Sequence, residues 1–205
     1  MQITKVEKQL KNEKRYSIFI DDEFAFGLSE VDVLYYKLKE NEEISEKKYE
    51  NILQNVVFSQ ARDKAIRYLS YKARTKAEVI KRLKKEEFSD EVITEVIELM
   101  VKYNYIDDMK YAKTCMEYMA NKKKYGISRI KFELQQKGVE KDVINELLNG
   151  ADFDETESAI LLLEKKTRGN KEFDGKEKQR VYNFLLRRGF STNIIKKAFE
   201  TYMGE

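Results

Sequence analysis

The strongest constraint on the fold is an apolar pattern that occurs three times at a spacing of 51 residues. Leu83, Leu134 and Leu185 hold the same place in the three copies, with no insertion inside the matched region. The other matched positions are Val79, Phe88, Val92, Ile93 and Val96, then Ile130, Val139, Val143, Ile144 and Leu147, then Val181, Phe190, Ile194, Ile195 and Ala198. A fixed period of this length is typical of tandem helical arrays, which present an extended surface to a large partner.

Composition favours an almost entirely helical chain. The 205 residues include no proline, the residue that most often interrupts a helix. Histidine is also absent, which excludes histidine-based catalysis and histidine-ligated metal sites. Charged residues make up 38% of the chain, but the net charge is only +3. A surface for a polyanion would therefore have to come from local clustering of cations.

Residues 1–60 differ from the rest and form a predicted N-terminal segment. Runs rich in β-branched and aromatic residues lie between Ile3 and Leu28, with a tight turn at residues 21–23. They predict a small antiparallel sheet. Because two or three strands are marginal alone, we expect the sheet to pack on the next helices. The first helix is predicted from an N-cap at Ser29 to about Asn41.

The remaining chain divides into three predicted three-helix repeats, at residues 61–106, 107–151 and 152–205. An apolar stripe from Ser45 to Ala73 indicates either one long helix or two helices joined near Phe58. Thr75 matches a capping box that opens the next helix, and Ser89 is the predicted N-cap of the helix after it. Later helices are expected near 108–123, 127–137 and 140–149, from Asp154, and near 176–187 and 192–203. The predicted fold class is mainly α, a tandem array of three three-helix repeats with a small β-containing N-terminal segment.

Three stretches of these repeats resemble the RecX family, bacterial regulators of the RecA recombinase. Tyr68-Leu69, Arg74-Thr75 and Glu78-Val79 are similar to the family's first-repeat pattern of an apolar pair, Arg-Ser and Glu-Leu. Tyr105-Ile106-Asp107-Asp108 with Tyr111-Ala112 resembles its Tyr-Leu-Asp-Asp junction, and Gly126, Arg129-Ile130, Glu133-Leu134 and Lys137-Gly138-Val139 resemble its Gly, Arg-Ile, Glu-Leu, Lys-Gly-Ile segment. In one departure, Glu87 stands where the other repeats have Gly138 and Gly189, which predicts a slightly different first corner.

The resemblance implies a regulatory protein and not an enzyme. It implies binding to RecA filaments on DNA, in the helical groove of the filament, with inhibition of RecA ATP hydrolysis and strand exchange. It therefore implies a role in recombination, DNA repair and the SOS response.

Cations gather on the second helix of every predicted repeat, which suits a phosphate backbone or an acidic filament groove. Tyr125 lies among them and is placed to stack on a base. The predicted partner-binding residues are Arg74, Lys81, Arg82 and Lys85, then Lys123, Lys124, Tyr125, Arg129 and Lys131, then Lys176, Arg180, Arg187 and Arg188. The alternative for each cation is a solvated helix face, with pairing to an acid at i, i+4.

Two other functions fit the same residues. One is sequence-nonspecific binding of nucleic acid without RecA, and the other is a helical-repeat adaptor for another acidic protein. The expected partners are the RecA filament and also DNA, which would be bound weakly and without sequence preference. The protein is expected to be a monomer.

Catalytic and membrane functions find little support in the sequence. Residues 21–23 and the pair Asp107-Asp108 are acidic, but a turn and a helix start favour acids without any metal. The sequence has no glycine-rich phosphate loop, so we expect no cofactor, no metal and no enzymatic activity. It also has no apolar run of membrane-spanning length and no signal-peptide pattern at its start, which predicts a cytoplasmic protein.

Overall fold

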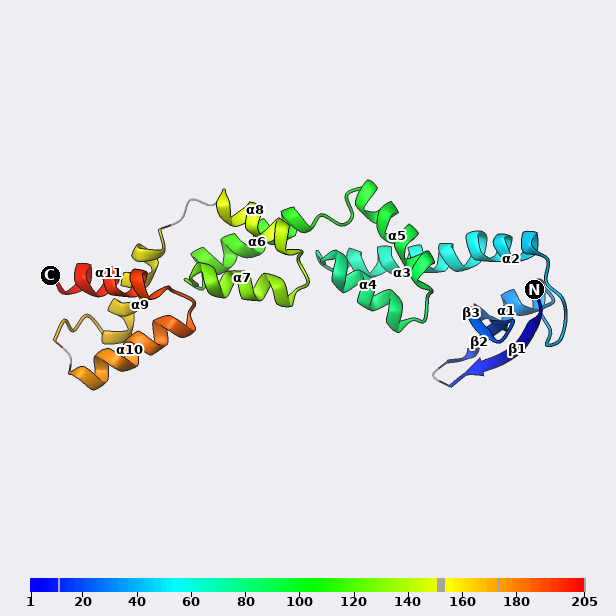
Figure 1. Cartoon of the computed structure of the whole chain (residues 1–205), viewed down its shortest axis with the longest axis horizontal. Helices are drawn as coiled ribbons and strands as arrows, with labels where there is room; N and C mark the ends of the chain where they lie inside the picture. The colour runs from blue at the N-terminus through cyan, green and yellow to red at the C-terminus, as the bar shows by residue number, and fades with distance from the viewer. Residues whose placement is uncertain (11, 151–153, 173, 205) are drawn as a thin grey trace. The chain divides into compact units, whose positions relative to one another are not determined.

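The computed structural model describes residues 1–10, 12–150, 154–172 and 174–204. The chain forms two compact units, Met1–Ile106 and Asp107–Glu205 (Figure 1). The first unit contains β1 (Ile3–Gln9), β2 (Asn12–Ile20), β3 (Glu23–Ser29), α1 (Glu30–Tyr35), α2 (Glu46–Ile52), η1 (Leu53–Phe58), α3 (Ser59–Ser70), α4 (Lys76–Lys85) and α5 (Asp90–Lys102). The second contains α6 (Asp108–Asn121), α7 (Ile127–Gln136), α8 (Lys141–Asn149), α9 (Glu155–Thr167), α10 (Gly175–Arg187) and α11 (Thr192–Met203). The predicted mainly helical fold with three three-helix repeats is confirmed, while the predicted boundary at 151 and 152 involves residues outside the described ones.

The predicted N-terminal sheet is present, with antiparallel strands in the order β1-β2-β3. Asp21 and Asp22 both have positive φ, of 49° and 68°, as a two-residue hairpin turn between twisted strands requires. The sheet ends at Ser29, whose hydroxyl accepts a hydrogen bond from the Asp32 N–H. Ser29 is therefore the N-cap of α1, as predicted.

The predicted end of this first helix, near Asn41, is wrong. α1 stops at Tyr35, and Lys37 adopts a left-handed φ of 48°. The turn lets Leu38 become buried, and its N–H donates to the Val33 carbonyl. The next residues then run along β1, where the Asn41 N–H donates to the Ile3 carbonyl. Burial and strand pairing with a distant segment thus outweigh local helix propensity.

Within the segment from Ser45 to Ala73, Glu46–Ser70 is one continuous run of helical turns, although not of one type. α2 passes into six residues of π-helix, η1, and then into α3. The change of type covers Phe58, where the sequence left open a join between two helices. Val57 of η1 is buried against the sheet, so the wider turns lie where the helix contacts the N-terminal segment.

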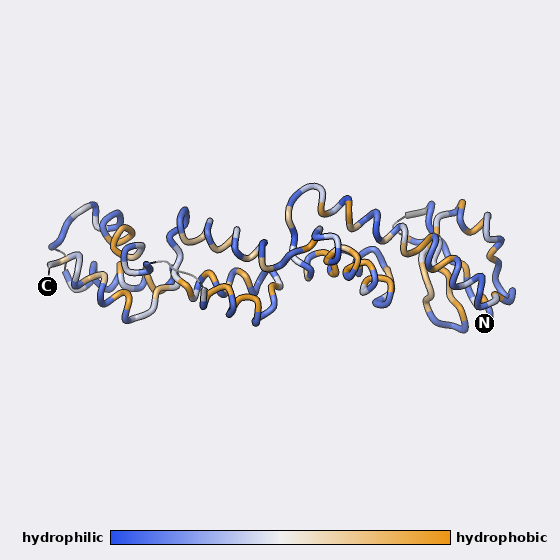
Figure 2. Tube along the Cα trace, turned by 90° about the horizontal axis from the view of Figure 1, so that it is seen from above, coloured by the Kyte–Doolittle hydropathy of each residue, from blue (hydrophilic) through white to orange (hydrophobic). Residues whose placement is uncertain are grey.

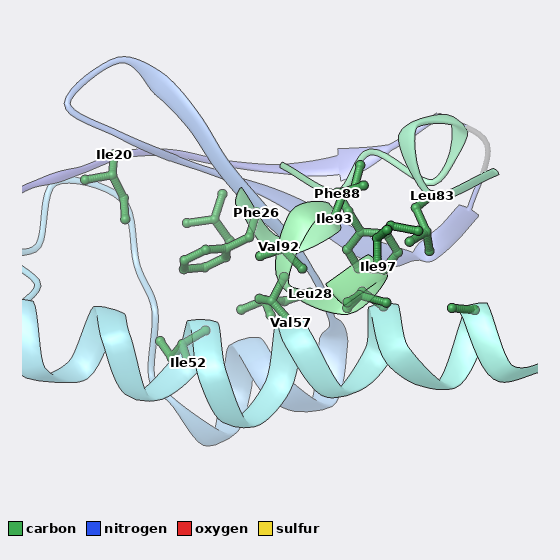
Figure 3. Close-up of a cluster of buried hydrophobic side chains, with 14 of the residues drawn as sticks. Ile20, Phe26, Leu28, Ile52, Val57, Leu83, Phe88, Val92, Ile93 and Ile97 are labelled. Atoms are coloured by element: carbon green, nitrogen blue, oxygen red, sulfur yellow. The ribbon is translucent and has the colours of Figure 1, made fainter. Parts of the chain in front are cut away.

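The sheet and the first three-helix repeat share one hydrophobic core. Phe26 and Leu28 of β3 point toward the helical turns that carry Ile52 and Val57 (Figure 3). A second connection is polar, since Arg15 of β2 donates to both the Gly27 carbonyl and the Gln60 amide oxygen. The expectation that the sheet packs on the following helices is therefore confirmed.

The second unit has a separate core in each of its two repeats. Hydrophobic and hydrophilic positions alternate along the helices of the chain (Figure 2), as amphipathic helices require. The three leucines that define the 51-residue pattern, Leu83, Leu134 and Leu185, are all at most 1% exposed. The repeat alignment made from sequence thus identifies equivalent buried positions.

The three corners after α4, α7 and α10 share one backbone conformation. Glu87 has a φ of 63°, against 77° for Gly138 and 91° for Gly189. The prediction of a different first corner is wrong, because the glutamate adopts the left-handed conformation that glycine adopts more easily. Its carboxylate also accepts a hydrogen bond from the Gln9 side chain of β1.

Candidate functional site

The predicted cations of the first repeat fall into two groups. Lys81 and Lys85 are exposed, and no acid among the described residues lies within ion-pair distance of either. Arg74 and Arg82 instead take part in the structure of the repeat. The Arg74 guanidinium lies 4.3 Å from the centre of the Tyr68 ring and 3.9 Å from Glu78. These two arginines fit the alternative in which helix cations pair at i, i+4.

Glu86, at the C-terminus of α4, is the acid that holds Arg82. Its carboxylate pairs with Arg82 at 2.5 Å and also with Lys64 of α3. Burial by itself raises the pKa of Glu86, but the Lys64 hydrogen bond and the charges of Lys64, Arg82 and Arg15 outweigh it, so that the pKa is lowered. The ionised Glu86 carboxylate thus links α3 to α4 through its ion pairs with Lys64 and Arg82. It also lowers the net charge of this basic helix.

In the second unit, the predicted residues of two repeats meet at one place. The Tyr125 ring is half-buried, and three cationic groups lie near its centre: Arg188 at 5.4 Å, Lys123 at 5.5 Å and Arg129 at 5.9 Å. Arg188 comes from the third repeat and also donates to the Lys123 carbonyl at 2.8 Å. The two basic clusters that the sequence placed on separate helices therefore form one cationic group around a tyrosine, which we call the Tyr125 cluster.

Backbone contacts bring the Tyr125 cluster together. The Gly126 N–H donates to the Arg188 carbonyl at 3.0 Å. A Cβ atom on Gly126 would lie 2.4 Å from the Gly189 carbonyl oxygen, and one on Gly189 would lie 2.3 Å from the Arg129 nitrogen. Only glycines allow the two corners to approach this closely.

An acid of the third repeat completes this contact. Gly126 is the N-cap of α7 and has no side chain to cap it. The Glu155 carboxylate accepts a hydrogen bond from the Ile127 N–H at 2.9 Å. Burial raises the pKa of Glu155, and this hydrogen bond offsets part of the rise. The sequence analysis did not single out Glu155, because no local signal connects it to α7.

The other predicted residues differ in how far they are engaged. Lys131 donates to the Asn145 side chain at 3.2 Å, and Arg129 pairs with Glu133 at 2.6 Å. Lys124 is half-buried and has a φ of 51°. Lys176, Arg180 and Arg187 on α10 are exposed, with no acid within ion-pair distance among the residues that the structure describes. The predicted cations that are exposed and make no ion pair, hydrogen bond or ring contact with the described residues are thus Lys81 and Lys85 in the first unit and these three on α10.

The acidic stretches noted in the sequence have local roles. Asp107 caps α6, since its carboxylate accepts from the Lys110 N–H at 2.8 Å, and residues 21–22 form the hairpin turn. In the described parts of the chain, no three His, Cys, Asp or Glu side chains are grouped as metal ligands would be. Across the same residues, no helix has both the length and the apolar character needed to cross a membrane.

Family models cover most of this chain in four consecutive matches. They are the regulatory protein RecX N-terminal domain at residues 1–45 and the first, second and third RecX three-helix domains at 61–98, 107–148 and 154–199. The chain is 34% identical to the regulatory protein RecX of Bacillus cytotoxicus, over 97% of this chain and 76% of that protein. It is 31% identical to the RecX protein of Clostridium botulinum strain Alaska E43, over 98% and 96%.

Solved structures agree with these matches. A crystal structure of a regulatory protein RecX has a TM-score of 0.64 and 27% identity, covering 96% of this chain and 98% of that one. The crystal structure of RecX from Lactobacillus salivarius has a TM-score of 0.65 and 26% identity, covering 71% and 96%. With its N-terminal sheet, its three three-helix repeats and these relatives, the chain belongs to the RecX family of regulatory proteins.

Proposed function

We propose that this protein binds RecA filaments on DNA and inhibits RecA ATP hydrolysis and strand exchange. The family carries a regulatory role. The observation that supports a filament as partner is the presence of exposed, unpaired cations on the second helix of both the first and the third repeat, at Lys81, Lys85, Lys176, Arg180 and Arg187. An acidic polymer with a regular repeat is a suitable partner for cations that recur along a chain.

The proposed mechanism is a shift in the population of filament states. A protein that binds one state of a filament more tightly than another moves the equilibrium by the difference in binding free energy. Inhibition therefore needs no reaction on the protein itself. We propose that it acts as a cytoplasmic monomer and that any direct contact with DNA is weak and independent of sequence, through phosphates.

The test is a titration of the protein into RecA filaments on single-stranded DNA while ATP hydrolysis is measured. The parent protein should lower hydrolysis in a dose-dependent way. Replacing all five exposed cations by glutamate should weaken inhibition at least about tenfold, because several charge contacts to an acidic surface are reversed together. Unchanged inhibition by this variant would contradict the proposed role of the basic helices.

A matched control reverses five other exposed lysines, Lys47, Lys72, Lys110, Lys113 and Lys197. The net charge changes by the same amount, so both variants should experience the same long-range repulsion. Surface substitutions of this kind usually change the free energy of unfolding by less than about 0.5 kcal/mol each. If the control loses inhibition as strongly as the test variant, only overall charge matters. If DNA alone is bound equally well without RecA, the protein is a nucleic-acid-binding protein instead.

A further inference from the structure

A groove opens between the second and third helices of the first repeat. It has a volume of about 630 Å³. Its apolar part is formed by Ile80 of α4 and by Ile97 and Val101 of α5, and the Val101 side chain is 45% exposed. Lys76 stands on the α4 wall and Glu98 on the α5 wall. We call this the first groove.

The third repeat has a groove of about 430 Å³ between α10 and α11. Its apolar part is formed by Tyr182, Phe199 and Met203, with Lys178 on the α10 wall and Glu200 on the α11 wall. The Lys178 ammonium lies 5.6 Å from the centre of the Phe199 ring. We call this the third groove.

The two grooves correspond position by position. Five residues of the third groove each lie 102 places, or two repeat lengths, after a residue of the first groove. The pairs are Lys76 and Lys178, Ile80 and Tyr182, Ile97 and Phe199, Glu98 and Glu200, and Val101 and Met203. The apolar residues change identity but remain large and apolar, while the lysine of one wall and the glutamate of the other are the same in both grooves. The recurrence of one lysine and one glutamate at fixed positions goes beyond the buried pattern, since helix packing places no demand on the charges of exposed positions.

The second repeat has polar residues at two of the corresponding positions. Lys131 and Asn145 correspond to Ile80 and Thr94 of the first groove. The Lys131 ammonium donates to the Asn145 side-chain oxygen at 3.2 Å. A polar bridge thus joins the two walls, α7 and α8, at the place where the other repeats present an apolar floor.

We propose that the first and third grooves are two equivalent docking sites for one element of the RecA subunit, each site taking one subunit of the filament. This inference rests on the proposed function and adds to it the surface that is used. Two matching grooves on one chain call for a partner that presents the same element twice. A polymer of identical subunits does so.

The chemistry of the walls specifies the element. An amphipathic helix in a groove between two helices inserts apolar side chains that recur every three or four residues. Ile97 and Val101 lie one helical turn apart on α5, as Phe199 and Met203 do on α11, so both grooves offer apolar contacts at the same interval along the wall. In both grooves the lysine lies on the second-helix wall and the glutamate on the third-helix wall, so a docked helix meets the same arrangement of charges in each, although Glu200 also pairs with Lys196 at 3.7 Å.

The second repeat supplies the design of the test variants. Ile80→Lys with Thr94→Asn copies the Lys131–Asn145 bridge into the first groove, and Tyr182→Lys with Lys196→Asn copies it into the third. A second pair, Val101→Glu and Met203→Glu, places a charge on each apolar floor at a side chain that is not buried. Leu161→Glu, at an exposed leucine on α9 outside both grooves, is the matched control. Circular dichroism establishes that each variant is folded.

Binding is measured on RecA filaments and, separately, on RecA fixed at low density without DNA. Linked sites gain up to about 10²- to 10⁴-fold in affinity when both engage. Closing one groove should therefore weaken filament binding about a hundredfold or more, equally for either groove. On separated subunits the same change should reduce the amount bound only about twofold, because one of two independent sites is lost. Closing both grooves should abolish binding to both surfaces.

The outcomes separate this inference from the proposed function. If the parent inhibits RecA but both single-groove variants bind filaments as the parent and Leu161→Glu do, the docking sites are wrong and the function stands. A loss confined to one groove would also contradict two equivalent sites. If the parent neither binds filaments nor inhibits hydrolysis, the proposed function fails and the docking sites fail with it.

Discussion

Gly126 shows how one missing side chain determines a contact between repeats. A methyl group there would lie 2.4 Å from the Gly189 carbonyl oxygen and 2.7 Å from the Phe190 nitrogen. Both are backbone atoms, so no side-chain rotation relieves the overlap. Gly126→Ala should therefore destabilise the second unit by about 1–3 kcal/mol, the usual range for overpacking. Urea denaturation followed by circular dichroism measures it.

Gly175→Ala is the matched control for this change. Gly175 is the first residue of α10, and a Cβ atom there would have no neighbour within 4 Å among the described residues. Alanine in a helix is favoured over glycine by roughly 0.5–1 kcal/mol. The control should be neutral or stabilising, and an equal loss in both variants would rule out the contact as the cause.

Glu87 offers the opposite test, since it is a glutamate in a backbone conformation that suits glycine. The left-handed conformation costs an ordinary residue roughly 1–2 kcal/mol. Glycine avoids this cost, but part of the gain in stability is lost because a glycine is more flexible in the unfolded chain. Glu87→Gly should stabilise the first unit by about 0.5–1 kcal/mol, even though it removes the exposed hydrogen bond from Gln9. A loss of stability in urea denaturation would mean that this hydrogen bond outweighs the strain.

The helix α7 depends on another repeat for its cap. Most described helices here carry their own cap, such as Ser89 for α5 or Asp107 for α6, whereas α7 receives its acceptor from Glu155 of α9. Glu155→Ala should destabilise the second unit by about 1 kcal/mol, the usual value of an N-cap side chain. The loss should appear in urea denaturation at neutral pH.

The titration of Glu155 predicts a pH dependence with a definite sign. Burial raises the pKa of Glu155 above its ordinary value of 4.5. Just above that pH, the folded protein therefore binds a proton at Glu155 more readily than the unfolded chain does. The stability contributed by Glu155 is thus complete below the unfolded pKa and is lost as the pH rises through the folded pKa. Glu155→Gln keeps an oxygen acceptor but does not titrate, so its stability relative to the parent should increase between pH 4 and pH 7. A relative decrease over this range would show that the carboxylate charge itself stabilises α7.

The division into two units has a consequence for folding. Every residue of the core that joins the sheet to the first repeat lies between Ile3 and Ile106, and the two other cores lie wholly beyond residue 106. We expect residues 1–106 and 107–205 to fold as separate proteins, each with a cooperative thermal transition. Circular dichroism of the two fragments measures this. An unfolded fragment would show that its stability depends on contacts with the other unit.

The same reasoning predicts how the two-repeat unit behaves. Its repeats have separate cores but are joined by the Gly126–Arg188 hydrogen bond and by the Glu155 cap. Neighbouring repeats of this kind unfold together when the contact between them is strong. Gly126→Ala should therefore broaden the transition of fragment 107–205 as well as lower its midpoint.

The sequence alone was sufficient for the features that depend on local patterns. The 51-residue spacing identified three equivalent buried leucines, and the caps at Ser29, Thr75 and Ser89 were placed correctly, because capping and helical periodicity involve residues three or four places apart. The strands were equally recognisable, since side-chain alternation and a two-residue turn are also local.

Only the tertiary structure decided which of the predicted partner-binding cations are already engaged. Arg188 and Lys123 are 65 positions apart, and Glu155 and Ile127 are 28 apart, yet each pair is joined by a hydrogen bond. The early end of α1 has the same origin, because the chain leaves the helix to pair with β1. Such contacts depend on how repeats and strands pack, and packing brings together residues whose separation in sequence follows no period. The sequence therefore determined what each repeat buries, and the fold determined which of its charges remain at the surface.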